Sequence, residues 1–295
     1  MSVVVGYGPN TPGESSLNLG ALLARSTGGP LIVCCVVPDR WEAPGLDRTD
    51  DAYVRALRAA ADQTLERARD ALHQAHDATF IVRTGRSVPR TLLDEASARG
   101  ARMAVVGSSP HGAWGHVALG SVTSRILHSS EIPVAMAPRG YRAVGNEKVR
   151  RLTVALDGTP NSHQVLLRAA ELAGRMGCRL RAVTFAVRGR TMIPPETGLH
   201  AEDAVVAAWR EQATAGLQAA VDGLREHQGV SAPEEARVVD GHGWADALER
   251  VGWDDGDLLV IGSSTSGVVS RVFLGSTATR IVRNAPVPVV LLPRG

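Results

Sequence analysis

The chain has few cysteines and few aromatic residues, and neither sign of charge dominates. Its three cysteines, Cys34, Cys35 and Cys178, lie inside or beside apolar runs without the spacing of metal ligands. We therefore expect neither a disulfide framework nor a zinc site. Small buried thiols fit such positions and a reducing, cytoplasmic compartment. The 32 lysines and arginines nearly balance the 30 aspartates and glutamates, which argues against a basic nucleic-acid surface.

Long apolar runs are also missing. No stretch reaches the ~18 continuous apolar residues that indicate a membrane span, and the N-terminus MSVVVGYG lacks the features of a secretion signal. The longest basic cluster, Lys148, Arg150 and Arg151, is interpreted as a solvated linker rather than a binding patch. We expect a cytoplasmic protein with no nucleic-acid partner and no membrane partner.

One passage of the sequence occurs twice. GSVTSRILHSSEIPVAMAPRG at 120–140 and GSTATRIVRNAPVPVVLLPRG at 275–295 are identical at nine of 21 positions. Each follows an apolar run that ends in glycine, and the offset is 155 residues throughout. Such a repeat indicates a duplicated domain, and 295 residues suit two domains of ordinary size. We assign the domains to 1–140 and 151–295, with 141–150 as the linker.

Both copies alternate short apolar runs with amphipathic segments. In the first copy, strands are predicted near 2–6, 31–37, 79–83, 103–106 and 134–137, helices near 15–26, 52–76, 88–97 and 120–129, and a loop at 39–50. In the second copy, strands are predicted near 152–156, 180–187, 237–239, 258–261 and 287–292, and helices near 164–176, 202–227, 245–251 and from about 276.

This alternation predicts an α/β fold of two tandem doubly wound, Rossmann-like domains. Strands that are apolar throughout are typical of a parallel sheet with helices on both faces. We expect a five-stranded parallel sheet of order 3-2-1-4-5 in each domain. In such sheets ligands bind beyond the carboxyl ends of the strands, where the strand order reverses.

The same short pattern follows the fourth predicted strand of each copy. Gly107 and Gly262 end that strand, and the Gly-Ser pairs at 120–121 and 275–276 open the next helix. A glycine before a helix lets backbone amides approach an anion, which the helix dipole also favours. The serine can cap the helix or donate to a phosphate. A single copy of this pattern equally fits a helix cap without a ligand.

With this pattern in both copies, the chain resembles the universal stress protein family in its tandem two-domain form, a fold also found in adenine-nucleotide α-hydrolases. The family motif is Gly, two residues, Gly, nine residues, then Gly-Ser or Gly-Thr. The resemblance implies that ATP is held by Gly107, Gly120 and Ser121 in the first copy and by Gly262, Thr265, Gly275, Ser276 and Thr277 in the second. It also implies that the nucleoside contacts Asp157, and that adenine lies near Val36 in the first copy and Phe185 in the second.

Departures from the motif separate the two copies. The middle glycine is replaced by Pro110, which lacks an amide hydrogen, and by Thr265, which keeps the amide but resists a positive φ. Tyr7 is aligned with Asp157, and its phenol would offer no carboxylate and would crowd the nucleoside. The first copy is therefore predicted to be a degenerate site. The second is predicted to bind ATP, with Mg²⁺ held mostly by phosphate and water.

Other polar residues have more than one interpretation. His111 and His116 fit exposed loop histidines, with phosphate donors or a weak metal pair as the alternative. Trp114, in the same loop, either covers the crevice or packs on the sheet edge. The segment His242–Trp244 is interpreted as a cap of the next helix. The acidic run at 254–257 is interpreted as a solvated turn, with a cation site as the alternative.

Three functions are compatible with the sequence. The first is a stress protein that binds an adenine nucleotide, is at most a slow ATPase, and signals to an unknown protein partner when the nucleotide orders the loop at 265–274. The second is a nucleotide-independent interaction protein with both sites degenerate. The third is an enzyme of the adenine-nucleotide hydrolase class, which GYGPN and DGTPNS disfavour because that class has a Ser/Gly-rich loop after the first strand. The sequence has no Walker lysine and no nucleophile elbow.

The last two predicted strands of the copies, 134–137 and 287–292, are apolar edges that would be hazardous if left open. By the resemblance, we expect the two copies to pair through them as an internal pseudo-dimer. Association of whole chains as a homodimer is left open.

Overall fold

The computed structural model describes residues 1–9, 13–39, 47–72, 77–143, 147–159, 162–187, 199–263 and 275–293. The first half contains β1 (Val3–Gly6), α1 (Ser15–Thr27), β2 (Leu31–Pro38), α2 (Asp47–Ala71), β3 (Ala78–Gly85), α3 (Val88–Ala98), β4 (Met103–Gly107), α4 (Ser121–Ser129) and β5 (Val134–Ala137). The second half repeats this order as β6 (Arg151–Leu156), α5 (Ser162–Met176), β7 (Arg179–Val187), α6 (Leu199–Arg225), β8 (Glu235–Gly241), α7 (Trp244–Glu249), β9 (Asp257–Gly262), α8 (Ser276–Asn284) and β10 (Val289–Leu292).

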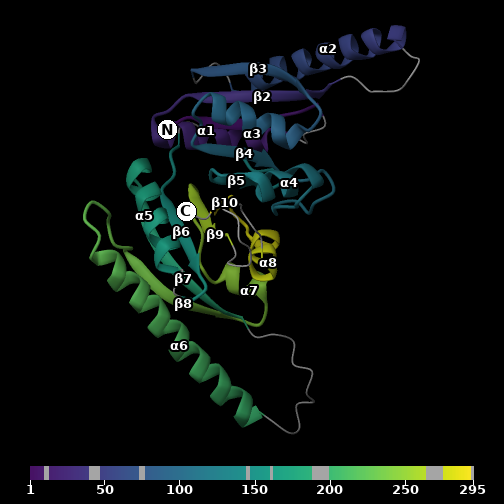
Figure 1. Cartoon of the computed structure of the whole chain (residues 1–295). Helices are drawn as coiled ribbons and strands as arrows, with labels where there is room; N and C mark the ends of the chain where they lie inside the picture. Colours follow the sequence, from purple (N-terminus) through teal and green to yellow (C-terminus); the bar gives the residue numbers. More distant parts are fainter. Residues whose placement is uncertain are drawn as a thin grey trace.

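These strands form one continuous sheet in the order β3-β2-β1-β4-β5-β10-β9-β6-β7-β8 (Figure 1). Within each half all neighbours are parallel, so the predicted order 3-2-1-4-5 is confirmed twice. The halves join where β5 and β10 pair antiparallel, with Ala135 opposite Val290. The expected pairing of the fifth strands is therefore present, and it merges the two expected sheets into one.

Helices cover both faces of the sheet. The inner strands β1, β4, β5 and β10 are apolar along their length because they are buried on both faces. On one face the strand side chains pack with α1, α2, α5 and α6, and on the other with α3, α4, α7 and α8 (Figure 1). Within the described ranges, no helix is both long enough and apolar enough to cross a membrane.

The strand register corrects one alignment that the sequence suggested. When Tyr7 is matched with Leu156, the pairing of β1 with β2 has the same register as the pairing of β6 with β7. These two side chains are 7% and 5% exposed and belong to the same hydrophobic layer. The residue that corresponds to Asp157 is therefore Gly8, and the prediction that Tyr7 crowds the nucleoside is wrong. The first half still lacks a carboxylate at this position, and the same register matches Val36 with Phe185.

Several boundaries differ from the predicted ones. The last part of the predicted loop at 39–50 is helical, because α2 begins at Asp47. β3 and β8 are longer than predicted. They are the outer strands of the sheet. Polar residues alternate with apolar ones there, so the ends of these strands cannot be recognised from an apolar run in the sequence.

The acidic run at 254–257 is not a solvated turn throughout. The side chain of Asp257 is 0% exposed and forms ion pairs with Arg151 and Arg181 at the start of the strands. Asp254 has a 68% exposed side chain and pairs with Arg151 at 2.9 Å. Among the described residues, no group of three or more His, Cys, Asp and Glu is suited to a metal ion. The run is therefore a buried ion-pair network with a solvated edge.

Candidate functional site

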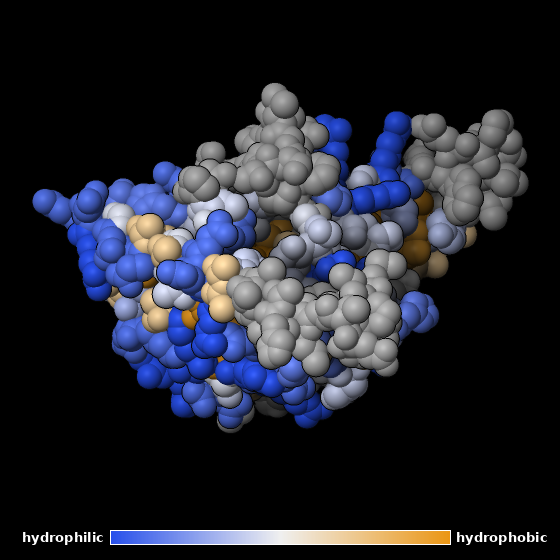
Figure 2. Space-filling model, turned by 90° about the horizontal axis from the view of Figure 1, so that it is seen from below, coloured by the Kyte–Doolittle hydropathy of each residue, from blue (hydrophilic) through white to orange (hydrophobic). Residues whose placement is uncertain are grey.

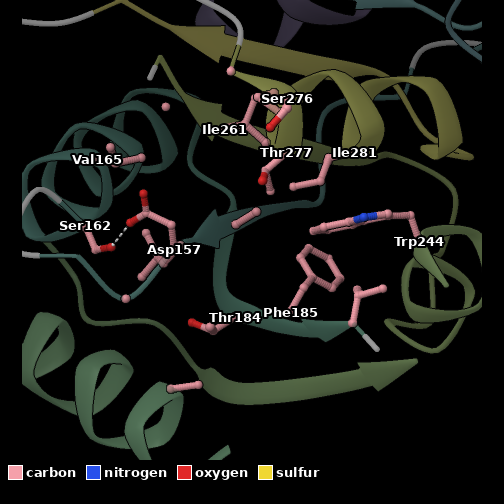
Figure 3. A pocket seen from close by; sticks show the side chains of 18 of the residues that line it. Asp157, Ser162, Val165, Thr184, Phe185, Trp244, Ile261, Ser276, Thr277 and Ile281 are labelled. Atoms are coloured by element: carbon pink, nitrogen blue, oxygen red, sulfur yellow. Dashed lines mark hydrogen bonds between the residues drawn. The ribbon is translucent and has the colours of Figure 1, made fainter. Parts of the chain in front are cut away.

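A cavity of about 590 Å³ lies at the carboxyl ends of β6, β7 and β9 (Figure 3). β6 pairs with β7 on one side and with β9 on the other, so this is the point where the strand order of the second half reverses. Six of the predicted site residues line the cavity: Asp157, Phe185, Gly262, Gly275, Ser276 and Thr277. The seventh predicted residue of this half, Thr265, and the loop at 265–274 lie outside the described residues.

The N-terminus of α8 forms one side of the cavity. Gly275 is the N-cap residue, so Ser276 and Thr277 belong to the first turn, and no side chain in the described part of the chain caps the helix. The first amides of a helix have no partner within it, and they carry the positive end of its dipole. Gly262 ends β9 beside this turn, and a Cβ there would lie 2.5 Å from a methyl of Val165. The packing of α5 thus requires a glycine where the cavity meets β9. The N-terminus of α8 beside it suits an anion.

The carboxylate of Asp157 is held in one orientation on another side of the cavity. Its Oδ1 accepts hydrogen bonds from the Thr159 amide (3.1 Å), the Thr159 hydroxyl (2.7 Å) and the Ser162 hydroxyl (2.8 Å; Figure 3). Burial raises the pKa of Asp157, but the hydrogen bonds from Thr159 and Ser162 outweigh it and hold this pKa below its ordinary value. The group is therefore an ionised, oriented acceptor at neutral pH.

Aromatic side chains form a third side. Phe185 on β7 is 8% exposed, and its ring meets the indole of Trp244 edge to face, with centroids 5.9 Å apart and planes at 64°. Trp209 on α6 also lines the cavity and is 43% exposed. The segment His242–Trp244 was expected only to cap a helix. The N-cap is Gly243, whereas Trp244 begins α7 and lines the cavity, which no spacing rule in the sequence indicated.

Two buried hydroxyl groups in the cavity wall have no hydrogen-bond partner among the described residues. They are Thr184 Oγ1 and Ser263 Oγ. A buried hydroxyl without a partner is costly, so such groups point to a ligand or a water molecule. Ser263 directly follows Gly262, and the motif could have indicated it. Together with the helix end, the Asp157 acceptor and the aromatic side, these donors fit a nucleotide.

The equivalent loop of the first half is closed on itself. The Ser109 amide donates to the carbonyl of Ala118 at 2.8 Å, and the Gly115 amide donates to the carbonyl of Arg139 at 2.9 Å. The Arg139 guanidinium in turn donates to the carbonyl of Gly112 at 2.8 Å. The amides of Ser109 and Gly115 are therefore bonded within the chain and hold the loop closed.

The predicted residues of the first half lie at the carboxyl edge of its strands. Gly107 ends β4, Gly120 is the N-cap of α4, and Ser121 begins that helix. Val36 is buried in β2, 9% exposed. Trp114 is 72% exposed, with the Arg139 guanidinium 5.8 Å from its ring centroid. The residues are thus brought to one edge, but around a loop that is already closed.

The comparisons with known proteins agree with this architecture. The model of the universal stress protein family matches residues 1–138 and again 148–293. A universal stress protein of Mycobacterium tuberculosis is 41% identical over 296 residues, which cover 99% of this chain and 100% of the relative. One of Mycolicibacterium smegmatis is 25% identical and is covered to 96%, with 98% of this chain aligned.

A solved structure of a universal stress protein from Archaeoglobus fulgidus superposes with a TM-score of 0.62 at 19% identity, covering 99% of this chain and 98% of that one. A second, from Pseudomonas aeruginosa, gives a TM-score of 0.58 at 16% identity and covers 99% and 93%. These two likenesses support the fold. With two matches of the family model and a full-length relative, the chain belongs to the universal stress protein family and consists of two of its domains in tandem.

Proposed function

We propose that this universal stress protein binds ATP, or a related adenine nucleotide, in the cavity of its second domain and acts as a nucleotide-dependent regulatory module. The observation that carries the proposal is the composition of the cavity. A helix N-terminus that no described side chain caps, an ionised carboxylate and an aromatic side surround about 590 Å³ of space. Each of these features matches one part of a nucleotide: phosphate, nucleoside and base.

The phosphates would lie against the first turn of α8. The amides after Gly275 and the hydroxyls of Ser276 and Thr277 are the donors available there. Ser263 adds a buried hydroxyl that lacks a partner among the described residues. Mg²⁺ would accompany the phosphates and be held mostly by phosphate oxygens and water, which is its usual preference. The protein's own contribution to the metal is therefore small in this proposal.

The nucleoside would lie between Asp157 and Phe185. The Asp157 carboxylate is oriented by Thr159 and Ser162, so it can accept from a nucleoside donor without losing side-chain freedom on binding. Phe185, which the family resemblance places near adenine, offers an apolar surface for the base.

The proposal places the nucleotide in the second domain alone. In the first domain the loop amides of Ser109 and Gly115 are bonded within the chain. Gly8 stands there in place of the Asp157 carboxylate. Binding rather than catalysis is the proposed role, with at most slow ATP hydrolysis, because the sequence has neither a Walker lysine nor a nucleophile elbow. A protein partner would recognise the nucleotide-bound state of the second domain.

A pair of matched substitutions tests this location. Thr277 and Val122 are the second residues of α8 and α4, at equivalent places in the two domains. Thr277→Trp would fill the cavity and is expected to reduce Mg-ATP affinity to below detection, whereas Val122→Trp places the same indole on the first domain and leaves affinity unchanged. Equilibrium dialysis with labelled ATP measures both. Loss of binding in Val122→Trp, or full binding in Thr277→Trp, would contradict the proposal.

A further inference from the structure

We infer that Trp244 determines which nucleotide the second domain accepts: its indole forms the wall against which the base packs, and this wall favours purine over pyrimidine nucleotides. The inference rests on the proposed function, since it concerns the base end of the same cavity. Neither the family motif nor the spacing of the chain assigns a role to this residue.

The backbone fixes where the indole lies. β8 ends at Gly241, where an added Cβ would lie 2.6 Å from Ala247, so the chain must turn tightly into α7. The carboxylate of Asp246 accepts a hydrogen bond from the His242 amide at 2.9 Å and pairs with Arg250, which closes the turn. Trp244 is consequently the first helical residue and stands at the carboxyl edge of the sheet.

The packing around the indole leaves it available to a ligand. Figure 3 shows Trp244 between Phe185 and Ile281, extending toward the middle of the cavity. All three side chains line the cavity, and Trp244 is only half-buried although it packs against the apolar layer of this face. The edge-to-face contact with Phe185 holds the ring at a fixed angle. A preformed aromatic wall therefore exists before any base arrives.

The chemistry of this wall discriminates by ring size. Stacking on an aromatic side chain is available to every base, but a bicyclic purine buries more ring surface than a pyrimidine. The polar groups of the cavity, Asp157 and the first turn of α8, contact parts that all nucleoside triphosphates share. The position equivalent to Trp244 in the first domain is Val88, the first residue of α3, so the aromatic wall belongs to the second domain only.

The test compares dissociation constants of Mg-ATP and Mg-CTP for the whole chain. Trp244→Ala is expected to weaken ATP binding by about tenfold to a hundredfold, and to bring the ratio of the two constants close to one. Trp244→Phe keeps an aromatic face and is expected to keep most of the preference. Trp114→Ala removes a 72% exposed indole of the first domain and is the matched control, expected to bind as the unchanged protein does.

An unchanged ATP-to-CTP ratio in Trp244→Ala overturns the inference. If that variant does not fold, Trp244→Leu replaces it, since leucine fills space without an aromatic face, and a ratio equal to that of Trp244→Phe again overturns the inference. Failure here is distinct from failure of the proposed function. A wild-type chain that binds no nucleotide defeats both, whereas one that binds ATP and CTP equally defeats only the role of Trp244.

Discussion

Replacement of Asp257 by alanine is expected to lower the free energy of unfolding by about 3–5 kcal/mol, the usual cost of removing one partner of a buried ion pair. The Asp257 side chain is 0% exposed, and its Oδ2 accepts hydrogen bonds from Arg151 Nε at 3.2 Å and the Asp254 amide at 3.1 Å. Arg181, whose side chain is 4% exposed, lies 3.8 Å from the same oxygen. Alanine would leave this buried guanidinium without its nearest carboxylate.

The network around Arg181 also fixes the position of its guanidinium. Arg181 Nη1 donates to the carbonyls of Val251 and Gly252 at 3.0 Å each, and Nε donates to the Thr153 hydroxyl at 3.0 Å. The Arg181 guanidinium lies 5.4 Å from the ring centroid of Trp253. The side chain is thus anchored in place and cannot swing into water when the charge of Asp257 is removed.

Urea unfolding followed by circular dichroism measures this effect. Asp254→Ala is the matched control: it removes a carboxylate from the same arginine, Arg151, but one with a 68% exposed side chain, so a change of less than about 1 kcal/mol is expected. If the Asp257 variant is not folded, Asp257→Asn keeps the shape and part of the hydrogen bonding and should still unfold at clearly lower urea. Equal stability of Asp257→Ala and Asp254→Ala would show that the buried pair contributes nothing beyond a surface pair.

Replacement of Asp157 by alanine is expected to weaken Mg-ATP binding by about tenfold to a hundredfold, the range for loss of one hydrogen bond to a charged acceptor. Asp157 lies at the carboxyl end of β6 in the cavity wall, and Thr159 and Ser162 hold its carboxylate ready for a nucleoside donor. Inorganic tripolyphosphate has no nucleoside, so its affinity should be unchanged by the same substitution. An equal loss for both ligands would mean that Asp157 acts through the fold rather than through the nucleoside.

The pKa of Asp157 adds a pH signature to this prediction. Burial raises that pKa and the hydrogen bonds from Thr159 and Ser162 lower it by more, so the carboxylate stays ionised down to below the ordinary value of about 3.9. Protonation of ATP itself affects wild type and Asp157→Ala alike. The ratio of their dissociation constants should therefore stay constant from about pH 8 to about pH 5, and a ratio that collapses within this window would contradict an ionised Asp157.

Much of the fold followed from patterns that repeat along the chain. The runs at 103–106 and 258–261 are apolar throughout, which indicated a parallel sheet with two covered faces. Local signals were weakest at the edges of the sheet, where β3 and β8 are half-polar. The assignment of Tyr7 failed because two neighbouring residues in a strand point to opposite faces, and only the register with β2 decides between them.

The cavity was predictable where it uses the repeated motif and, at Asp157 and Phe185, through the family resemblance. Gly262, Gly275 and Ser276 could be recognised because the same residues occur at the same spacing in the first copy, at 107, 120 and 121. Trp244 and Ser162 approach from α7 and α5, so their place in the cavity depends on helix packing and carries no motif. The pairing of Asp257 with Arg181 was equally hidden, because the two residues belong to β9 and β7, which are separated in the sheet by β6 and lie far apart in sequence.

The most direct test of the central claim is the number of nucleotides that one chain binds. The purified protein is denatured to release and identify any nucleotide it carries, and the stripped chain is then titrated with Mg-ATP in a calorimeter. An open cavity in the second domain and a closed loop in the first predict a single site per chain, which Thr277→Trp removes. Two equivalent sites per chain, or no binding up to millimolar ATP, would contradict this view of the molecule.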